Sequence, residues 1–187
     1  IRVIDPFAGD GRLVRWLIEV YSISITPNVN WEVTLWDVNQ DGLITAEKEF
    51  QNLESSDRVS LKISQGDAFV KAINDDGEAY LNQFDVVITN PPWEVIKPDH
   101  RQIKKISCSE DRKKIVSKLK LYDQFLESNY PLSQPETKFA GWGTDLSRVG
   151  LELCFKLSKS TGYIAIVLPN SFLADHKSRK IRKHVLL

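Results

Sequence analysis

The alternation of short apolar runs with helical patterns is the feature that most constrains the fold of this chain of 187 residues. The sequence predicts strands at residues 1–5, 31–37, 59–65, 84–89 and 162–168, and helices at about 11–21, 44–53, 111–127 and 145–159. Strands rich in Val, Ile and Leu that alternate with helices favour right-handed crossovers and a mainly parallel sheet. The pattern therefore predicts an α/β fold, a Rossmann-like doubly wound sheet with helices on both faces.

Polar or turn-forming residues end or closely follow every predicted strand. They are Asp5, Asp37, Asp67, Asn90 and the pair Pro169-Asn170. In doubly wound sheets, ligands bind beyond the carboxyl ends of the strands, at the point where the strand order reverses. We therefore expect the function of the chain to depend on these strand ends.

A glycine turn joins the first predicted strand to the first helix. It reads Pro6-Phe7-Ala8-Gly9-Asp10-Gly11, and its two glycines can supply backbone angles and close approaches that a side chain would forbid. A strand, a glycine turn and a helix in this order suit a nucleotide-type ligand. Arg12 and Leu13 follow in place of the third glycine of a dinucleotide-binding motif, which argues against a nicotinamide cofactor.

The tetrapeptide Asn90-Pro91-Pro92-Trp93 directly follows the fourth predicted strand. It carries a side-chain carbonyl, a backbone carbonyl and an aromatic face, which suit an amino group attached to a flat, conjugated ring. The two prolines fix the backbone of this segment without helix or sheet pairing. The pattern favours methylation of such an amino nitrogen, and the alternative interpretation is a Pro-Pro pair that only ends a strand.

Taken together, these two segments resemble known enzymes. The sequence Asp5-Pro6-Phe7-Ala8-Gly9-Asp10-Gly11 resembles the first motif of S-adenosylmethionine-dependent methyltransferases. With Asn90-Pro91-Pro92-Trp93 after it, the chain resembles the amino-methylating DNA methyltransferases that modify adenine in bacterial restriction-modification systems. The resemblance implies S-adenosylmethionine as the cofactor, DNA as the partner and Asn90, Pro91, Pro92 and Trp93 as the catalytic residues. It needs no metal.

The same resemblance assigns the cofactor site. Asp37 closes the second strand, where an acid in Rossmann-like folds accepts the ribose hydroxyls. Asp67 resembles the position that accepts a hydrogen bond from the adenine amino group of the cofactor, with Phe69 or Val38 against its ring. For both acids the alternative role is a helix N-cap. The implied cofactor-binding residues are Asp5, Pro6, Phe7, Ala8, Gly9, Gly11, Asp37, Val38, Asp67, Ala68 and Phe69.

Basic residues gather after the tetrapeptide. Between Lys97 and Lys120 there are nine Lys or Arg and three acidic residues, and a second basic cluster lies at residues 177–183. We expect this region to contact DNA phosphates, with Lys97, Lys104 and Lys105 among the contacts, unless it is only the solvated face of a helix. Phe172 is expected to flank the target base, or to be an aromatic residue at the edge of the core.

The length of the chain favours a single domain, residues 1–187. Only about twenty residues separate Asp67 from Asn90, which leaves no room for a DNA-recognition domain between them, so the resemblance implies that this domain lies after residue 187. It also implies a catalytic core truncated at both ends, with a recognition domain and a nuclease that are fused or associated. No apolar run is long enough to span a membrane, and the two cysteines lie far apart without nearby histidine. We expect a bacterial protein of the cytoplasm without a zinc site.

Several alternatives remain open at the level of sequence. Residues 37–45 fit the start of an EF-hand calcium loop, but Lys48 stands where that loop needs a bidentate glutamate. RNA amino-methyltransferases and protein-glutamine methyltransferases share the fold and a similar Asn-Pro-Pro-aromatic segment. A non-catalytic nucleic-acid-binding module of this fold would carry a damaged tetrapeptide, whereas residues 90–93 are intact.

Overall fold

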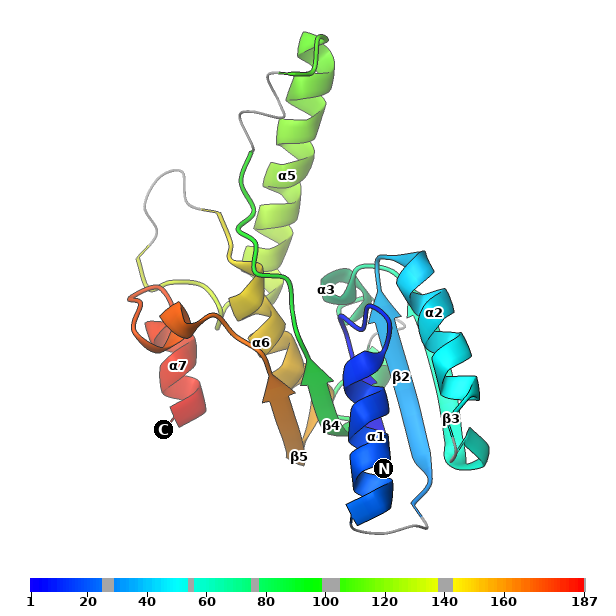
Figure 1. Ribbon diagram of the computed structural model, residues 1–187. Coiled ribbons are helices and arrows are strands. Elements are labelled where there is room, and N and C mark those ends of the chain that lie inside the picture. The colour runs from blue at the N-terminus through cyan, green and yellow to red at the C-terminus, as the bar shows by residue number, and fades with distance from the viewer. Residues whose placement is uncertain (25–28, 54–55, 75–77, 99–104, 138–142, 187) are drawn as a thin grey trace. The chain divides into compact units, whose positions relative to one another are not determined.

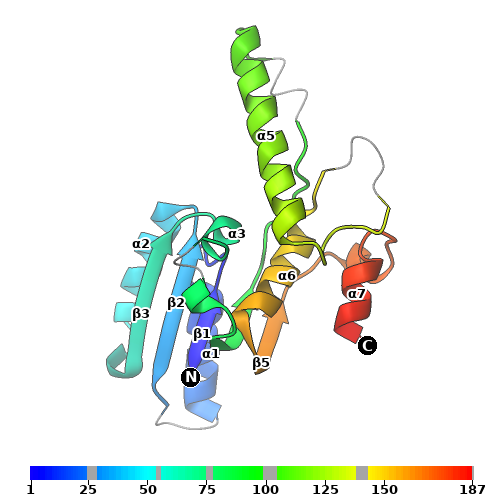
Figure 2. The ribbon, with the colours of Figure 1, turned by 180° about the vertical axis from the view of Figure 1, so that it is seen from behind.

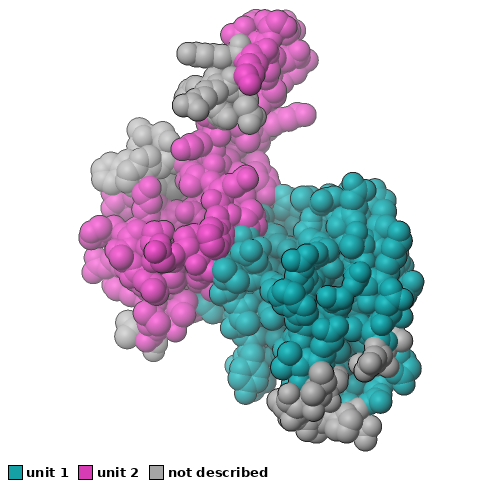
Figure 3. Space-filling view, in the orientation of Figure 1, with its two compact units in different colours: residues 1–91, 153–167 teal, residues 92–152, 168–187 magenta. Residues whose placement is uncertain are grey.

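The computed structural model describes residues 1–24, 29–53, 56–74, 78–98, 105–137 and 143–186. These residues form two compact units (Figure 3). The first comprises Ile1–Pro91 and Leu153–Val167, and the second comprises Pro92–Glu152 and Leu168–Leu187. The boundary therefore runs through the predicted catalytic tetrapeptide, between Pro91 and Pro92.

A five-stranded sheet forms the centre of the first unit (Figure 1). All neighbouring strands are parallel, in the order β3-β2-β1-β4-β5. This arrangement confirms the predicted α/β fold with a doubly wound, parallel sheet. The strands are β1 (Arg2–Asp5), β2 (Trp31–Asp37), β3 (Val59–Gln65), β4 (Phe84–Thr89) and β5 (Ser158–Ile166).

Helices α1 (Arg12–Ser24) and α2 (Gln40–Gln51) pack on the same face of this sheet (Figures 1 and 2). Val14 and Ile18 of α1 are fully buried, and Ala46 and Phe50 of α2 join the same apolar core. The helical spacing of these residues explains why each helix presents one apolar face to the strands. Short helical turns lie at η1 (Ser56–Arg58), α3 (Ala68–Lys71) and η2 (Glu78–Tyr80).

The second unit contains most of the helical residues that follow β4. They are α5 (Ser109–Asn129), the first part of α6 (Leu146–Leu157), η3 (Asn170–Leu173) and α7 (Arg179–Leu186). Leu126 near the end of α5 is fully buried, but Ile115 in its first half is 38% exposed. The apolar residues of α5 are therefore buried only toward the end of the helix. No helix in the described part of the chain is long and apolar enough to cross a membrane.

The last strand differs from its prediction. The helix predicted at 145–159 ends at Leu157, and β5 follows at once from Ser158 instead of beginning at residue 162. The pairing with β4 shifts from Phe84↔Ser158 to Val86↔Tyr163, which leaves the residues between as a bulge. The Lys159 ammonium lies 2.6 Å from the Asp85 carboxylate and holds this bulge against β4.

Gly162 ends the bulge, at a place without room for a side chain. A Cβ atom there would lie 2.5 Å from the Ser158 hydroxyl and 2.9 Å from the Phe84 carbonyl oxygen. The bulge and the return to regular pairing with β4 therefore both depend on a glycine.

Gly162→Ala should lower the free energy of unfolding by about 1 to 3 kcal/mol, because the added methyl group forces β5 away from β4. Urea denaturation measures the loss. Thr161→Ala, at the exposed neighbouring position, is the control and should change stability by less than about 0.5 kcal/mol. Equal stability of Gly162→Ala and the wild type would contradict the close packing described for β5.

Candidate active site

The carboxyl ends of β1 and β4 lie side by side in the middle of the sheet, paired through Val3↔Val86 and Ile4↔Val87. From β1 the chain proceeds toward β2 and β3 on one side, and β4 and β5 lie on the other. This pair is therefore the topological switch point at which ligands bind in doubly wound folds. The glycine turn follows β1 and Asn90 follows β4, so the topology places the two sequence motifs at neighbouring strand ends.

The turn after β1 has the backbone that its glycines predict. Gly9 and Gly11 have φ angles of +53° and +71°. A Cβ atom on Gly11 would lie 3.0 to 3.1 Å from side-chain atoms of Leu35, Ala46 and Phe50, so this glycine lets the turn sit on the core. A Cβ atom on Gly9 would meet nothing within 4 Å. Open space beside Gly9 is what a ligand that approaches the backbone requires.

Asp37 at the end of β2 holds this turn in place. Its Oδ2 atom accepts a hydrogen bond from the Gly9 amide at 2.8 Å, and its Oδ1 atom accepts one from the Asn39 amide at 2.7 Å. Asn39, not Asp37, is the N-cap of α2, because its side chain accepts from the Asp41 amide. The alternative N-cap role of Asp37 is therefore wrong. Each carboxylate oxygen retains a second lone pair for a ligand hydroxyl.

Gly42 also supports this turn, a contribution that was not predicted from the sequence. A Cβ atom on Gly42 would lie 2.7 Å from the Gly9 carbonyl oxygen, so only glycine allows the first turn of α2 to approach so closely. The predicted helix began only at residue 44, so the sequence placed Gly42 in the turn before it, where a glycine is common.

Asp67 caps α3, as the alternative interpretation predicted. Its Oδ1 atom accepts hydrogen bonds from the amides of Phe69 at 2.9 Å and Val70 at 3.4 Å. Ala68 and Phe69 are buried, and the Phe69 ring packs on Phe7 with 5.1 Å between the ring centroids. Phe69 thus packs against the Phe7 ring. Val38, just after β2, is 67% exposed and is accessible to a ligand ring.

Asp5 is fully buried at the end of β1. Its Oδ1 atom accepts hydrogen bonds from the Phe7 amide at 3.0 Å and from the Thr89 hydroxyl at 2.5 Å. Burial raises the pKa of Asp5 to about 7; the hydrogen bonds from Thr89 and Phe7 lower it, and the charge of Asp37 raises it further. The resemblance implied that Asp5 contacts the cofactor. A side chain with 0% exposure cannot make such a contact directly. Pro6 and Ala8 are buried beside it.

The tetrapeptide leaves the sheet at Thr89. Asn90 is exposed, and its side chain has no hydrogen bond to any residue that the structure describes, whereas Pro91 is buried. Both residues belong to the first unit, and Pro92 and Trp93 begin the second. The Trp93 side chain is 54% exposed. An exposed amide and an exposed indole are what the predicted roles in binding an amino group require.

Within the second unit, the segment after Trp93 is anchored to the start of α6. The Ile96 amide donates to the Thr144 carbonyl, and the Leu146 amide donates to the Glu94 carbonyl, each at 2.8 Å. Between these bonds, Val95 and Asp145 form an antiparallel bridge. The Thr144 amide in turn donates to the Asp123 carboxylate of α5 at 2.7 Å. These bonds fix the residues that follow Trp93.

The predicted substrate contacts lie in the second unit. Lys97 and Lys105 are exposed, and Lys104 lies outside the described residues. Phe172 in η3 is only 8% exposed, which favours the alternative role of a core-edge aromatic, and Leu173 beside it is 71% exposed. The buried position of Phe172 could not be read from the sequence, because it depends on the residues that pack around η3.

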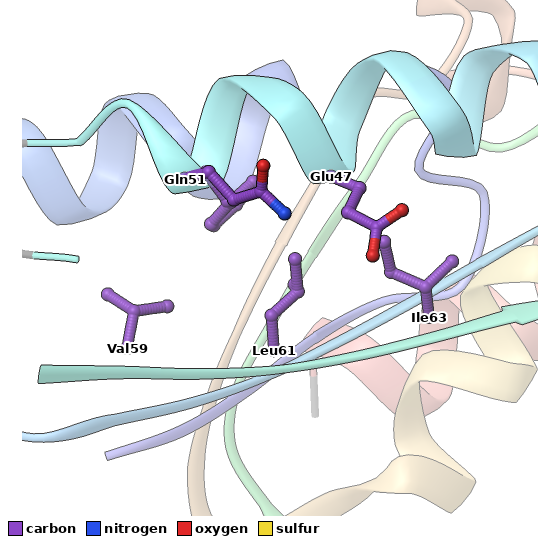
Figure 4. A pocket seen from close by; sticks show the side chains of 6 residues that line it. Glu47, Gln51, Val59, Leu61 and Ile63 are labelled. Atoms are coloured by element: carbon purple, nitrogen blue, oxygen red, sulfur yellow. The ribbon is translucent and has the colours of Figure 1, made fainter. Parts of the chain in front are cut away.

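A pocket of about 470 Å³ lies elsewhere in the first unit, between α2 and β3 (Figure 4). Its lining residues include Glu47 and Gln51 of α2 and Val59, Leu61 and Ile63 of β3. Glu47 and Gln51 lie in the second half of α2, whereas Asn39 at the start of that helix lies beside the strand ends. The pocket is therefore on the flank of the sheet and not at the switch point.

Among the described residues, no group of three or more His, Cys, Asp or Glu side chains could hold a metal ion. The stretch that resembles a calcium loop forms the end of β2, the Asn39 cap and the start of α2. The residues from Gln40 onward are helical, so they do not form the extended loop that an EF-hand site requires. The calcium interpretation finds no support in this geometry.

Asp5→Asn should flatten the dependence of stability on pH. Since the folded-state pKa of Asp5 is about 7 and its ordinary value is 3.8, the native state binds the extra proton between these values. Stability therefore falls as the pH rises through this window, and the variant should gain stability relative to wild type toward pH 8. Urea denaturation at several pH values measures this difference.

Asp85→Asn is the matched control with the opposite sign. The hydrogen bond from the Arg2 amide and that from Lys159 lower the pKa of Asp85, so its contribution is present at neutral pH and is lost as the pH falls. The stability gap between this variant and wild type should close in acid. Parallel pH profiles for the Asp5→Asn variant and wild type would contradict the burial effect assigned to Asp5.

Comparisons with known proteins agree with this fold. The structure resembles a class I S-adenosylmethionine-dependent methyltransferase from Listeria monocytogenes, with a TM-score of 0.60 and 15% identity over 99% of this chain and 44% of the other. It also resembles the methyltransferase subunit of a type I restriction-modification system from Streptococcus thermophilus, with a TM-score of 0.58 and 17% identity over 100% of this chain and 33% of the other.

The chain thus has the class I methyltransferase fold and spans less than half the length of either protein. A comparison with curated protein sequences finds no match. A family model of the Eco57I restriction-modification methylases matches residues 21–187, which is most of the sequence. The chain belongs to the Eco57I restriction-modification methylase family.

Proposed function

We propose that this chain is the catalytic core of a methyltransferase that methylates the exocyclic amino nitrogen of adenine in DNA. Its cofactor is S-adenosylmethionine, in accord with the methylase family and the class I fold. The observation that carries the proposal is the position of Asn90. Its exposed amide follows β4 at the switch point, directly beside the β1 strand end that carries the glycine turn.

Residues of the first unit fit the proposed cofactor. The open side of Gly9 admits a ligand to the backbone, and the remaining lone pairs of Asp37 can accept the two ribose hydroxyls. Val38 offers an exposed apolar surface to the adenine ring, and Phe7, supported by Phe69, offers an aromatic one. Asp67, which caps α3, is proposed to accept from the adenine amino group.

When bound, the cofactor supplies a methyl group that is already activated by a positively charged sulfur. The task of the chain is therefore to position the acceptor nitrogen, whose lone pair is delocalised into the ring. The Asn90 side-chain carbonyl and the Pro91 backbone carbonyl accept its two hydrogens and draw the nitrogen toward a tetrahedral geometry, which frees its lone pair from conjugation with the ring. Once methylated, the nitrogen releases one of these two hydrogens as a proton. This step needs no covalent intermediate, because positioning and polarisation lower the barrier.

The exposed Trp93 indole stacks on the target base once the base has left the duplex. Extrusion costs a few kcal/mol, and stacking on an aromatic side chain returns about 1 to 3 kcal/mol. The basic character of α5 supports a nucleic-acid partner. RNA and a protein glutamine are the rival acceptors, and transfer of a labelled methyl group to DNA, RNA and peptide acceptors distinguishes the three.

Asn90→Ala should lower kcat for DNA methylation by roughly a hundred- to a thousandfold, the range for loss of one preorganised hydrogen-bonding group. The dissociation constant of S-adenosylmethionine, measured by calorimetry, should change little, because Asn90 binds the acceptor. Asn74→Ala removes another exposed asparagine of the first unit and is the matched control. Wild-type methylation rates in Asn90→Ala would exclude the assigned role.

Charge reversal on α5 should weaken DNA binding. Lys114 and Lys118 lie one turn apart on the helix, and both are exposed. In the double variant Lys114→Glu with Lys118→Glu, affinity should fall, and the salt dependence of binding should weaken by about one unit of slope per lost phosphate contact. Lys62→Glu, on the exposed side of β3, is the control. Unchanged affinity and slope in the double variant would remove α5 from the DNA interface.

A further inference from the structure

Thr89 is the last residue of β4 and directly precedes Asn90. It is fully buried. Its carbonyl oxygen accepts a hydrogen bond from the Val167 amide at 3.0 Å, at the end of β5. Its hydroxyl donates to Asp5 Oδ1 at 2.5 Å, at the end of β1. Thr89 is thus held from both sides at the point where the chain leaves the sheet.

The same Asp5 oxygen accepts the Phe7 amide at 3.0 Å. One atom therefore connects the glycine turn after β1 with the end of β4. The other oxygen, Oδ2, is buried without a hydrogen-bond partner among the described residues. The titratable groups that act on Asp5 are Asp37 on β2 and Cys154 on α6, and burial raises the pKa of the Cys154 thiol as well.

Packing alone does not account for this pair. A carboxyl and a hydroxyl with 0% exposure cost free energy that two apolar side chains of the same shape would not cost. Valine has the shape of threonine, and Val87 lies on the same strand. A hydrogen-bonded polar pair at this position instead provides a directional link between two strand ends, which apolar packing cannot provide.

We propose that the hydrogen bond between Thr89 and Asp5 is a positioning element that sets Asn90 relative to the Phe7–Gly9 turn. Thr89 and Asp5 do not contact the substrate. They act through Asn90, which directly follows Thr89 in the chain, and through Phe7, whose amide donates to Asp5. The inference rests on the proposed function, because the hydrogen bond aligns Asn90 with the proposed cofactor site.

Three variants of the protein test this link. Thr89→Val keeps the shape of the side chain and removes the donor, Thr89→Ser keeps the donor, and Thr45→Val is the control. Thr45 donates its hydroxyl to the Asp41 carbonyl within α2, so its replacement removes a hydroxyl hydrogen bond elsewhere in the first unit. For each variant, kcat and KM for methylation, the dissociation constant of S-adenosylmethionine and the side-chain amide resonances of Asn90 are measured.

Thr89→Val should lower kcat roughly ten- to a hundredfold, the range for misplacement of a catalytic group by about 1 Å. KM for DNA and the cofactor dissociation constant should stay within about twofold, because Asn90 acts after binding. The Asn90 amide resonances should shift in Thr89→Val and stay near their wild-type positions in Thr89→Ser and Thr45→Val. Thr89→Ser should restore most of the rate.

Wild-type kcat or unshifted Asn90 resonances in Thr89→Val would overturn the proposal. Equal losses in Thr89→Val and Thr89→Ser would also overturn it, because they would show a requirement for shape and not for the hydroxyl. The proposed function fails separately, if the wild-type protein transfers no methyl group to DNA. In that case the Asn90 resonances still decide whether the link between Thr89 and Asp5 positions this residue.

Discussion

The buried carboxyl of Asp5 is the group on which the centre of this structure depends. It accepts the Phe7 amide and the Thr89 hydroxyl on one oxygen, so it joins the turn after β1 to the end of β4. Desolvation makes such a group costly, and the cost appears in its raised pKa. The fold accepts this cost at the switch point of the sheet, where both sequence motifs begin.

Around this centre, backbone amides donate hydrogen bonds to side-chain carboxylates. Asp37 holds Gly9, Asp67 holds the start of α3, and Asp5 holds Phe7. The three acids at strand ends therefore organise the loops that a ligand would contact. Their roles in the protein and their proposed roles toward S-adenosylmethionine are compatible, because a carboxylate oxygen can accept more than one hydrogen bond.

The sequence predicted the inner part of the sheet accurately. Strands β2, β3 and β4 cover the predicted residues, because apolar runs bounded by turn-forming residues report strands that are buried in a parallel sheet. The start of β5 was wrong by several residues, since the bulge depends on a contact between Lys159 and Asp85 that periodicity does not reveal. Helix α2 begins at Gln40, before the predicted residue 44, because Asn39 caps it.

The backbone of the candidate site was predictable in part, whereas the burial of several of its side chains was not. The positive φ angles of Gly9 and Gly11 and the exposed Asn90 follow from local sequence. The burial of Asp5 and Phe69 does not, because it is decided by neighbours that lie far away along the chain, such as Thr89 and Phe7.

The contact between Gly42 and Gly9 has a consequence for ligand binding. The start of α2 packs directly against the backbone of the glycine turn. A ligand that immobilises the turn also immobilises the first residues of α2. Its binding free energy therefore includes the conformational entropy that the start of this helix loses. Exchange of the α2 amides with solvent would then slow on binding, although no ligand atom touches them.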